Sequence, residues 1–108
     1  MPIENNQDLH NLTHAMHEFV RKKGWYDANS KRVQSPRNLA ISLSIEAAEV
    51  LELFQWGEQP HDQQQLASEL ADVMLYLLQL ASVTEVDLGE AVEKKLAINA
   101  KRTWDNDV

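Results

Sequence analysis

The segment LASELADVMLYLLQLASV, residues 66–83, is apolar on nearly every side when its residues are placed at helical spacing. A helix of this kind has to be buried on all sides, so it needs several packing partners. The segment 36–56 has the same character, because Ile41, Ala48 and Leu51 lie away from its main apolar stripe. Four helices of one chain cannot easily cover two such members. We therefore expect a homo-oligomer with these two segments at or near the interface.

Four helical stretches are predicted, and their start signals are explicit. Ser35 followed by Pro36 is typical of an N-cap with proline in the first helical position. Asp62 and Asp87 each precede a glutamine or glutamate by three residues, which resembles a capping box. No segment alternates long enough to predict a strand, and only 3 Gly and 3 Pro are present. We predict an all-α fold, a four-helix bundle that forms one domain over residues 1–108. The expected helices span residues 6–23, 36–56, 63–83 and 88–103.

The formal net charge is -7, which disfavours nucleic acid or an anionic membrane as the main partner. The absence of cysteine excludes disulfides, thiolate metal sites and a cysteine nucleophile. No uninterrupted apolar run approaches the roughly 18 residues of a transmembrane helix. The first ten residues, MPIENNQDLH, lack the basic and apolar segments of a signal peptide. We therefore expect a cytoplasmic protein.

Two pairs of carboxylates interrupt the apolar helices. Glu46 lies in the middle of the apolar stripe of residues 36–56, and Glu49 lies at its edge. Glu69 and Asp72 repeat the three-residue spacing on the next helix. On facing helices, four carboxylates in a partly dry site would need cations, and Mg²⁺ takes few protein carboxylates per ion. This pattern favours two or more Mg²⁺ ions, with Mn²⁺ as a substitute.

A solvated helix face would explain paired acids equally well, and spacing alone does not decide between the two readings. For Glu52, which lies off the stripe, we expect the solvated face.

Longer stretches resemble the all-α nucleotide pyrophosphohydrolases of the MazG-like group, nearest to the dCTP pyrophosphatase branch. They are PRNLAISLSIEAAEVLELFQW, ELADVMLYLLQLA and VDLGEAVEKKLAINAKR. Glu-x-x-Glu is followed by Glu-x-x-Asp, by a tyrosine four residues after the aspartate, and by Lys-x-x-x-Asn. The resemblance implies a helical bundle that forms a homodimer or homotetramer and uses Mg²⁺ to hydrolyse a nucleoside triphosphate to the monophosphate and pyrophosphate. The implied role is nucleotide-pool sanitation, with dCTP or a modified pyrimidine deoxynucleotide as substrate.

The resemblance also implies roles for individual residues. The metal ligands would be Glu46, Glu49, Glu69 and Asp72. The catalytic residues would be Glu49, as general base, with Lys95 and Arg102, which would stabilise phosphate charge. The substrate-binding residues would be Trp25, Trp56 and Tyr76, which line a nucleoside pocket, and Asn99. Arg37 and Asn38 follow a helix start, where backbone N–H groups can also meet phosphate.

Each of these roles has a structural alternative. Asn99 could bond to a neighbouring helix, because an amide in an apolar stripe needs partners. Lys95 and Arg102 could be surface charges near a helix C-terminus. Trp25 and Trp56 could belong to the core.

The chain departs from the family around Trp25. RKKG precedes this residue, the segment YDANSKRVQS before Pro36 is longer than expected, and no histidine stands in it. Met16 occupies the position at which some relatives have a base-contacting histidine. These differences lie where base selectivity would be set.

His10, His14 and His17 have a spacing that can bind a transition metal. They lie on the polar shoulder of the first helix, and we expect a solvated face.

A non-catalytic helical dimerisation module that binds a nucleotide or a partner helix is the competing hypothesis. It would explain the apolar helices but gives the two carboxylate pairs no role.

Overall fold

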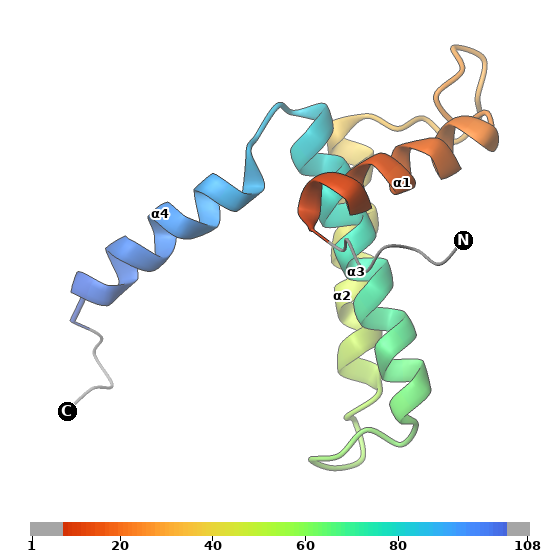
Figure 1. The fold of residues 1–108 in the computed structure, drawn as a ribbon. Coiled ribbons are helices and arrows are strands. Elements are labelled where there is room, and N and C mark those ends of the chain that lie inside the picture. The colour runs from red at the N-terminus through yellow and green to blue at the C-terminus, as the bar shows by residue number, and fades with distance from the viewer. Residues whose placement is uncertain (1–7, 104–108) are drawn as a thin grey trace, which may run out of the picture.

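A computed structural model describes residues 8–103 and contains four helices in that range (Figure 1). They are α1 (Leu9–Lys22), α2 (Pro36–Glu52), α3 (Gln63–Val83) and α4 (Leu88–Lys101). No strand occurs among residues 8–103. The all-α class and the four predicted helices are therefore confirmed. The predicted start of the first helix at residue 6 lies outside the described residues.

The predicted N-caps are confirmed by hydrogen bonds. The side chain of Ser35 accepts from the backbone N–H of Asn38, and Pro36 occupies the first turn of α2. Asp62 accepts from two backbone N–H groups at the start of α3, and Asp87 accepts from the N–H of Glu90. Each cap satisfies donors that the helix itself leaves unpaired, which explains why these helices begin where they do.

Helix α2 ends at Glu52, four residues before the predicted end at Trp56. The backbone N–H of Leu53 donates to the carbonyl of Val50, and that of Gly57 donates to the carbonyl of Phe54, so the last bonds span three residues. Bonds of this kind tighten a helix end. Leu53 turns into the core with 4% of its surface exposed, and the FQW segment becomes a turn.

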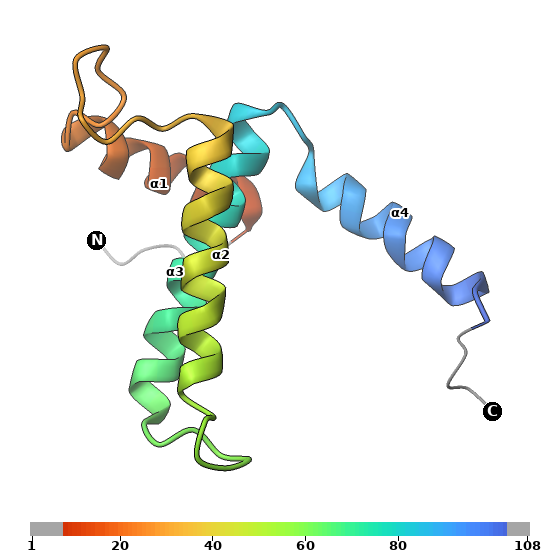
Figure 2. The same ribbon diagram turned by 180° about the vertical axis from the view of Figure 1, so that it is seen from behind.

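Helices α2 and α3 run antiparallel and side by side, and α1 crosses the half of α3 that lies near its C-terminus (Figures 1 and 2). The buried core lies mainly where these three helices meet. Met16 and Val20 come from α1, Leu39 from α2, and Leu78 and Ala81 from α3. The core therefore holds the α2–α3 pair in a fixed register, which positions the carboxylates described below.

Helix α4 leaves this three-helix core and extends away from it (Figures 1 and 2). None of its residues is buried, and Val92, Leu96 and Ile98 are each about half exposed or more. The radius of gyration is 16.8 Å, whereas a compact domain of this length has about 13 Å. One chain therefore leaves its fourth helix without a packing partner among the described residues. The expected oligomer remains a prediction.

Helix α3 is long and apolar enough to cross a membrane by length and composition, with a mean hydropathy of 1.4 over its best 18-residue window. This is weak evidence, because core helices of soluble proteins meet the same criterion. Glu69 and Asp72 lie within α3 and face α2. Ionised carboxylates at these positions would be costly if the helix crossed a lipid bilayer. The expectation of no membrane partner and a cytoplasmic location remains a prediction.

Candidate metal centre and adjoining cavity

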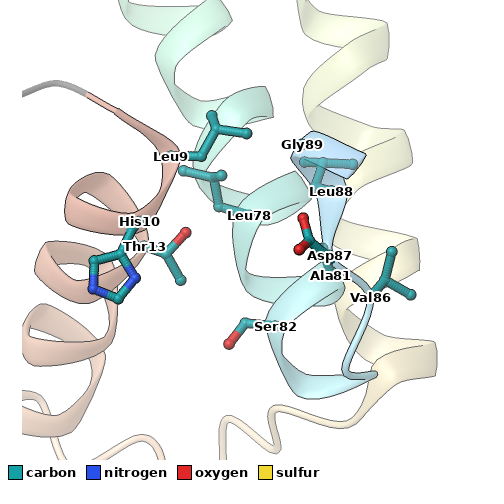
Figure 3. A pocket seen from close by; sticks show the side chains of 10 residues that line it. All are labelled: Leu9, His10, Thr13, Leu78, Ala81, Ser82, Val86, Asp87, Leu88 and Gly89. Carbon is teal, nitrogen blue, oxygen red and sulfur yellow. The ribbon is translucent and has the colours of Figure 1, made fainter. Parts of the chain in front are cut away.

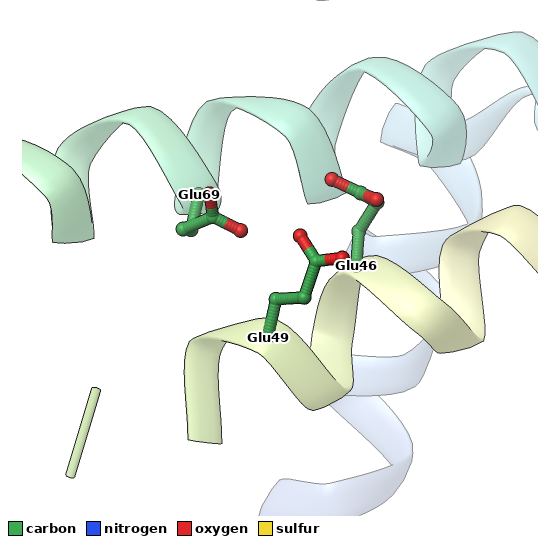
Figure 4. A group of neighbouring side chains, drawn as sticks. All are labelled: Glu46, Glu49 and Glu69. Carbon is green, nitrogen blue, oxygen red and sulfur yellow. The ribbon is translucent and has the colours of Figure 1, made fainter. Parts of the chain in front are cut away.

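Three carboxylates meet between α2 and α3. Glu46 and Glu49 project from α2 toward Glu69 of α3 (Figure 4), and one oxygen from each lies within 4.8 Å of the others. All three side chains are half-buried. The antiparallel pairing of the two helices brings together acids that the sequence separates by about 20 residues. Glu52, by contrast, is exposed, as expected from its place off the stripe.

Burial and like charge both oppose ionisation in this cluster. Burial raises the pKa of Glu46 above its ordinary value of 4.5, and the charges of Glu49 and Asp72 act in the same direction. The contact with the carboxyl of Glu49 raises the pKa of Glu69, and burial and the surrounding acids add to the effect. The two ion pairs found within residues 8–103, Arg21–Glu18 and Lys94–Glu90, lie elsewhere. Within the described part of the chain, no ion pair balances the negative charge of the cluster.

The cluster fits a hard divalent cation. The Oε2 atom of Glu69 is buried and has no hydrogen-bond partner among the described residues. Buried polar atoms are normally satisfied, and a bound cation would satisfy an unpaired carboxylate oxygen that lies next to two further acids. All the available donors are carboxylate oxygens, which Mg²⁺ and similar ions prefer.

A cavity of about 420 Å³ adjoins the cluster between α1, α3 and the loop at residues 24–34. Asp72 lines it, and the same residue helps to raise the pKa of Glu46, so this aspartate belongs to both the cavity and the acidic site. Trp25 and Tyr76 also line the cavity, and Met16 forms part of its wall. The cavity is mostly apolar with one acidic end, which suits a flat ring attached to a charged group.

Aromatic and cationic groups shape one wall of this cavity. The rings of Phe19 and Trp25 meet edge to face, with centroids 5.6 Å apart. The guanidinium carbon of Arg32 lies 4.2 Å from the centroid of the Trp25 ring. Arg32 therefore covers one face of the tryptophan, a favourable cation–π arrangement. The long loop that departs from the family pattern supplies this arginine.

His17 was predicted to lie on a solvated face, and this prediction is wrong. Its Nδ1 lies 2.6 Å from the hydroxyl of Tyr26, and its Nε2 lies 2.7 Å from the hydroxyl of Ser82. Burial lowers the pKa of His17, and the charges of Arg21 and His14 lower it further. Ser82 lies 65 residues along the chain, so no local pattern could have predicted this contact. His10 and His14 are exposed, as expected.

Sequence reasoning also missed Gln79 and Gln34. Gln79 lies in the apolar helix α3, yet only 3% of its surface is exposed. Both glutamines line the cavity described above and are bonded to each other. A polar residue inside the stretch LLQLAS was the available signal, because a buried amide requires partners.

Several predicted substrate residues lie outside this site in the single chain. Trp56 is 88% exposed in the turn after α2, and Arg37 is exposed on the first turn of that helix. Asn38 donates from Nδ2 to the carbonyl of Val33 and lines a smaller cavity of about 220 Å³, which Tyr76 also borders.

The predicted residues of α4 are separated from the acidic site by the departure of that helix. Lys95, Asn99 and the C-cap residue Arg102 line neither the cavity of about 420 Å³ nor a smaller one of about 240 Å³ beside Glu49 and Glu69. The Oδ1 atom of Asn99 is buried and lacks a hydrogen-bond partner within residues 8–103. One chain therefore gathers part of the predicted set, namely Glu46, Glu49, Glu69, Asp72, Trp25 and Tyr76.

A further cavity, of about 300 Å³, lies between the start of α1 and the turn from α3 to α4 (Figure 3). Leu9 and Thr13 line it from α1, and Val86 and Asp87 line it from the turn. None of the predicted site residues lines this cavity, so it is separate from the acidic cluster.

Comparisons with known proteins agree with these features. A model of the MazG-like family matches residues 41–107. The dCTP pyrophosphatase 1 of Homo sapiens is 37% identical over 110 residues, which cover 94% of this chain and 60% of that protein. A dATP/dGTP diphosphohydrolase of Cyanophage S-2L is 50% identical over 36 residues, 33% of this chain and 34% of that protein. The chain thus spans about 60% of the length of its mammalian relative.

One solved structure is similar over nearly its whole length. It is a pyrophosphatase from Archaeoglobus fulgidus, 33% identical in sequence, with a TM-score of 0.74. The match covers 92% of this chain and 94% of the archaeal one. The helical arrangement described above is therefore shared with a pyrophosphatase of similar length.

Proposed function

Because this chain belongs to the MazG-like family, we propose that it is a nucleoside triphosphate pyrophosphohydrolase that releases a nucleoside monophosphate and pyrophosphate. The observation that carries the proposal is the carboxylate cluster of Glu46, Glu49 and Glu69, with one buried unpaired oxygen, beside an apolar cavity. The pyrophosphatases to which the chain is similar support the same reaction class.

The acidic residues have distinct tasks in this proposal. Glu46, Glu49, Glu69 and Asp72 would hold two or more Mg²⁺ ions, or Mn²⁺ in their place. When bound, such ions would screen the charge of the triphosphate and polarise a phosphoryl oxygen. Glu49, at the edge of the cluster, orients a water molecule and accepts its proton as the general base. Asp72 connects the cluster with the adjoining cavity.

The cavity of about 420 Å³ takes the nucleoside, with Trp25 and Tyr76 as its aromatic walls. We propose dCTP or a modified pyrimidine deoxynucleotide as the substrate, in line with the similarity to dCTP pyrophosphatase 1. Removal of such nucleotides would make the protein an enzyme of nucleotide-pool sanitation.

The remaining predicted residues require a second copy of the chain in this proposal. Helix α4 extends away from its own acidic cluster and exposes apolar residues (Figure 2). In a homodimer or homotetramer the helix would pack on another copy. Lys95 and Arg102 would then reach the phosphates, where they stabilise developing negative charge. Asn99, whose buried oxygen lacks a partner among the described residues, would also acquire one.

A product-release assay tests the proposal. Each common dNTP and NTP is incubated with the full chain and Mg²⁺, and pyrophosphate is separated from orthophosphate. We expect pyrophosphate and the monophosphate, with dCTP cleaved fastest. Orthophosphate as the released product, or no product from any nucleotide, would contradict the proposed reaction.

Thermal melting separates this proposal from a non-catalytic dimerisation module. The full chain is melted with and without Mg²⁺, alongside Glu46→Gln. A metal site predicts that Mg²⁺ raises the Tm of the wild type and raises that of the variant less, because a ligand that binds only the folded state stabilises it. Equal curves with and without the ion would favour the module.

A further inference from the structure

Gln79 is the one polar residue among the buried residues of the described chain, with 3% of its surface exposed. Its Nε2 donates to the Oε1 of Gln34 at 2.7 Å and to the hydroxyl oxygen of Tyr26 at 3.2 Å. An amide nitrogen carries two hydrogens, so these two bonds use both of them. Within residues 8–103 no hydrogen bond is found to the Oε1 of Gln79. The residue nevertheless lines the cavity next to the acidic cluster.

The Gln34 side of this arrangement fixes which way the Gln79 amide points. The Nε2 of Gln34 donates to the backbone carbonyl of Arg32 at 2.7 Å. A carbonyl can only accept, so Gln34 must place its nitrogen there and turn its Oε1 toward Gln79. The Nε2 of Gln79 must then donate to this oxygen. If the Gln79 amide were rotated, its Oε1 would lie next to the Oε1 of Gln34, and two acceptors would face each other.

The Tyr26 side leads to the same orientation. Burial keeps the pKa of His17 below its ordinary value, so the ring is neutral at neutral pH. The Nε2–H of His17 can donate to Ser82, and the hydroxyl of Tyr26 can donate to Nδ1. In this arrangement the Nε2–H of His17 and the O–H of Tyr26 each have an acceptor, and the Tyr26 oxygen is left free to accept from Gln79. Five side chains from α1, α3 and the long loop thus form one hydrogen-bonded network: Ser82, His17, Tyr26, Gln79 and Gln34.

We propose that Gln79, held in place by Gln34 and Tyr26, selects the base of the substrate. Its Oε1 is a fixed acceptor in the cavity wall, and it would accept a hydrogen from an exocyclic amino group. The inference rests on the proposed function and names its substrate class: nucleotides with a 4-amino pyrimidine or a 6-amino purine. A 4-oxo or 6-oxo base would place a second acceptor against Gln79, and a buried acceptor pair is unfavourable.

Matched nucleotide pairs test this inference. In dCTP and dUTP, and likewise in dATP and dITP, an amino group is exchanged for an oxo group at the same ring position. The full chain is assayed with Mg²⁺, and kcat/KM is compared within each pair. For the wild type we expect the amino member to be favoured by about tenfold or more, because a site built around one hydrogen bond rejects the analogue that lacks it.

Two variants probe this hydrogen-bonded network. Gln79→Met removes the acceptor. The ratio of kcat/KM between the amino and the oxo member of each pair should then come close to one, mainly because the amino member is cleaved more slowly. Gln34→Met leaves Gln79 in place but removes one of the two acceptors that hold its amide nitrogen, so the amide rotates more easily and cleavage of the oxo member should rise. A folding defect cannot produce that gain. Gln64→Met, an exposed position on the same helix, is the matched control and should keep the wild-type ratio.

The outcomes separate the two proposals. Pyrophosphate release with a ratio near one in the wild type would overturn the role of Gln79 and leave the proposed function standing. An unchanged ratio in both Gln79→Met and Gln34→Met would do the same. No pyrophosphate from any of the four nucleotides would overturn the proposed function, and the inference with it.

Discussion

Two buried side-chain oxygens lack a hydrogen-bond partner in the described part of the chain: Oε2 of Glu69 and Oδ1 of Asn99. Native structures rarely leave such atoms unsatisfied. Glu69 lies among carboxylates, so its missing partner is best explained as a cation. Asn99 lies on the helix that leaves the core, so its missing partner is best explained as a group from another molecule. Both unpaired atoms coincide with residues that the sequence assigned to function.

Replacement of Glu49 by Gln tests the acidic cluster. The change removes one negative charge and the proposed proton acceptor while it preserves the shape of the side chain. We expect kcat to fall by about 100-fold or more, the lower range for general-base catalysis. Circular dichroism should show unchanged helix content.

Glu52→Gln is the control for this variant, because Glu52 lies on the same helix and is exposed. It should retain activity within about twofold, as surface substitutions usually do little. Full activity in Glu49→Gln would refute both the metal-binding and the general-base role of that residue.

The environment of His17 predicts a dependence of stability on pH. Its folded-state pKa lies below the ordinary value of 6.5, because of burial and then of the charges of Arg21 and His14. The unfolded chain therefore binds a proton more readily than the folded chain. The stability contributed by neutral His17 is present above pH 6.5 and is lost as the pH falls through the lowered pKa. Tyr26, the titratable group that faces the ring from the loop, remains neutral in this range.

Thermal melting at pH 7.5, 6.5 and 5.5 measures this effect. The Tm of the wild type should fall more steeply toward low pH than that of His17→Gln, which cannot take up a proton. Parallel curves for the two proteins would show that His17 does not titrate with folding.

At the scale of secondary structure, local signals explain where the helices begin. Ser35, Asp62 and Asp87 each accept a hydrogen bond from a backbone N–H two or three residues ahead. Contacts of this range are visible in a sequence. The end of α2 is different. The burial of Leu53 and the change to hydrogen bonds that span three residues depend on packing against other helices. The prediction that the helix continues to Trp56 was wrong for this reason.

Asp62→Ala tests the cap of α3. The change removes an acceptor for the backbone N–H groups of Gln64 and Gln65. We expect a loss of about 1 kcal/mol in the free energy of unfolding, and a Tm lower by roughly 4–8 °C for a domain of this size. Chemical denaturation and thermal melting measure both quantities. Glu58→Ala, in the exposed loop before the helix, should change neither, and an equal loss in this control would contradict the capping role of Asp62.

At the scale of the whole molecule, the single chain is expanded. Its radius of gyration is 16.8 Å, and α4 carries no buried residue. Small domains gain stability by burying more apolar surface in an oligomer. The exposed side chains of α4 and those on the outer side of α2, such as Ile41 and Ile45, are the surfaces that another copy would cover.

Leu96→Glu tests whether α4 mediates assembly. Leu96 is 63% exposed on the apolar stripe of α4, and a charge there would be buried unpaired in an interface. We expect the wild type to sediment as a dimer or tetramer and the variant as a smaller species. Lys94→Glu introduces the same side chain on the opposite side of the helix by helical spacing and should assemble normally. A wild type that sediments as a monomer would rule out the proposed oligomer.

The sequence by itself determined the helices, their N-caps and the two pairs of acids, because each depends on spacings of three or four residues. The sequence indicated that the two pairs would come together if their helices faced each other, and in the structure Glu46 and Glu49 meet Glu69. Only the tertiary structure decided the burial of Gln79, the contact of His17 with Ser82 and the departure of α4. These features depend on groups that lie far apart in the chain, and a pattern of residues three or four apart does not reveal such contacts.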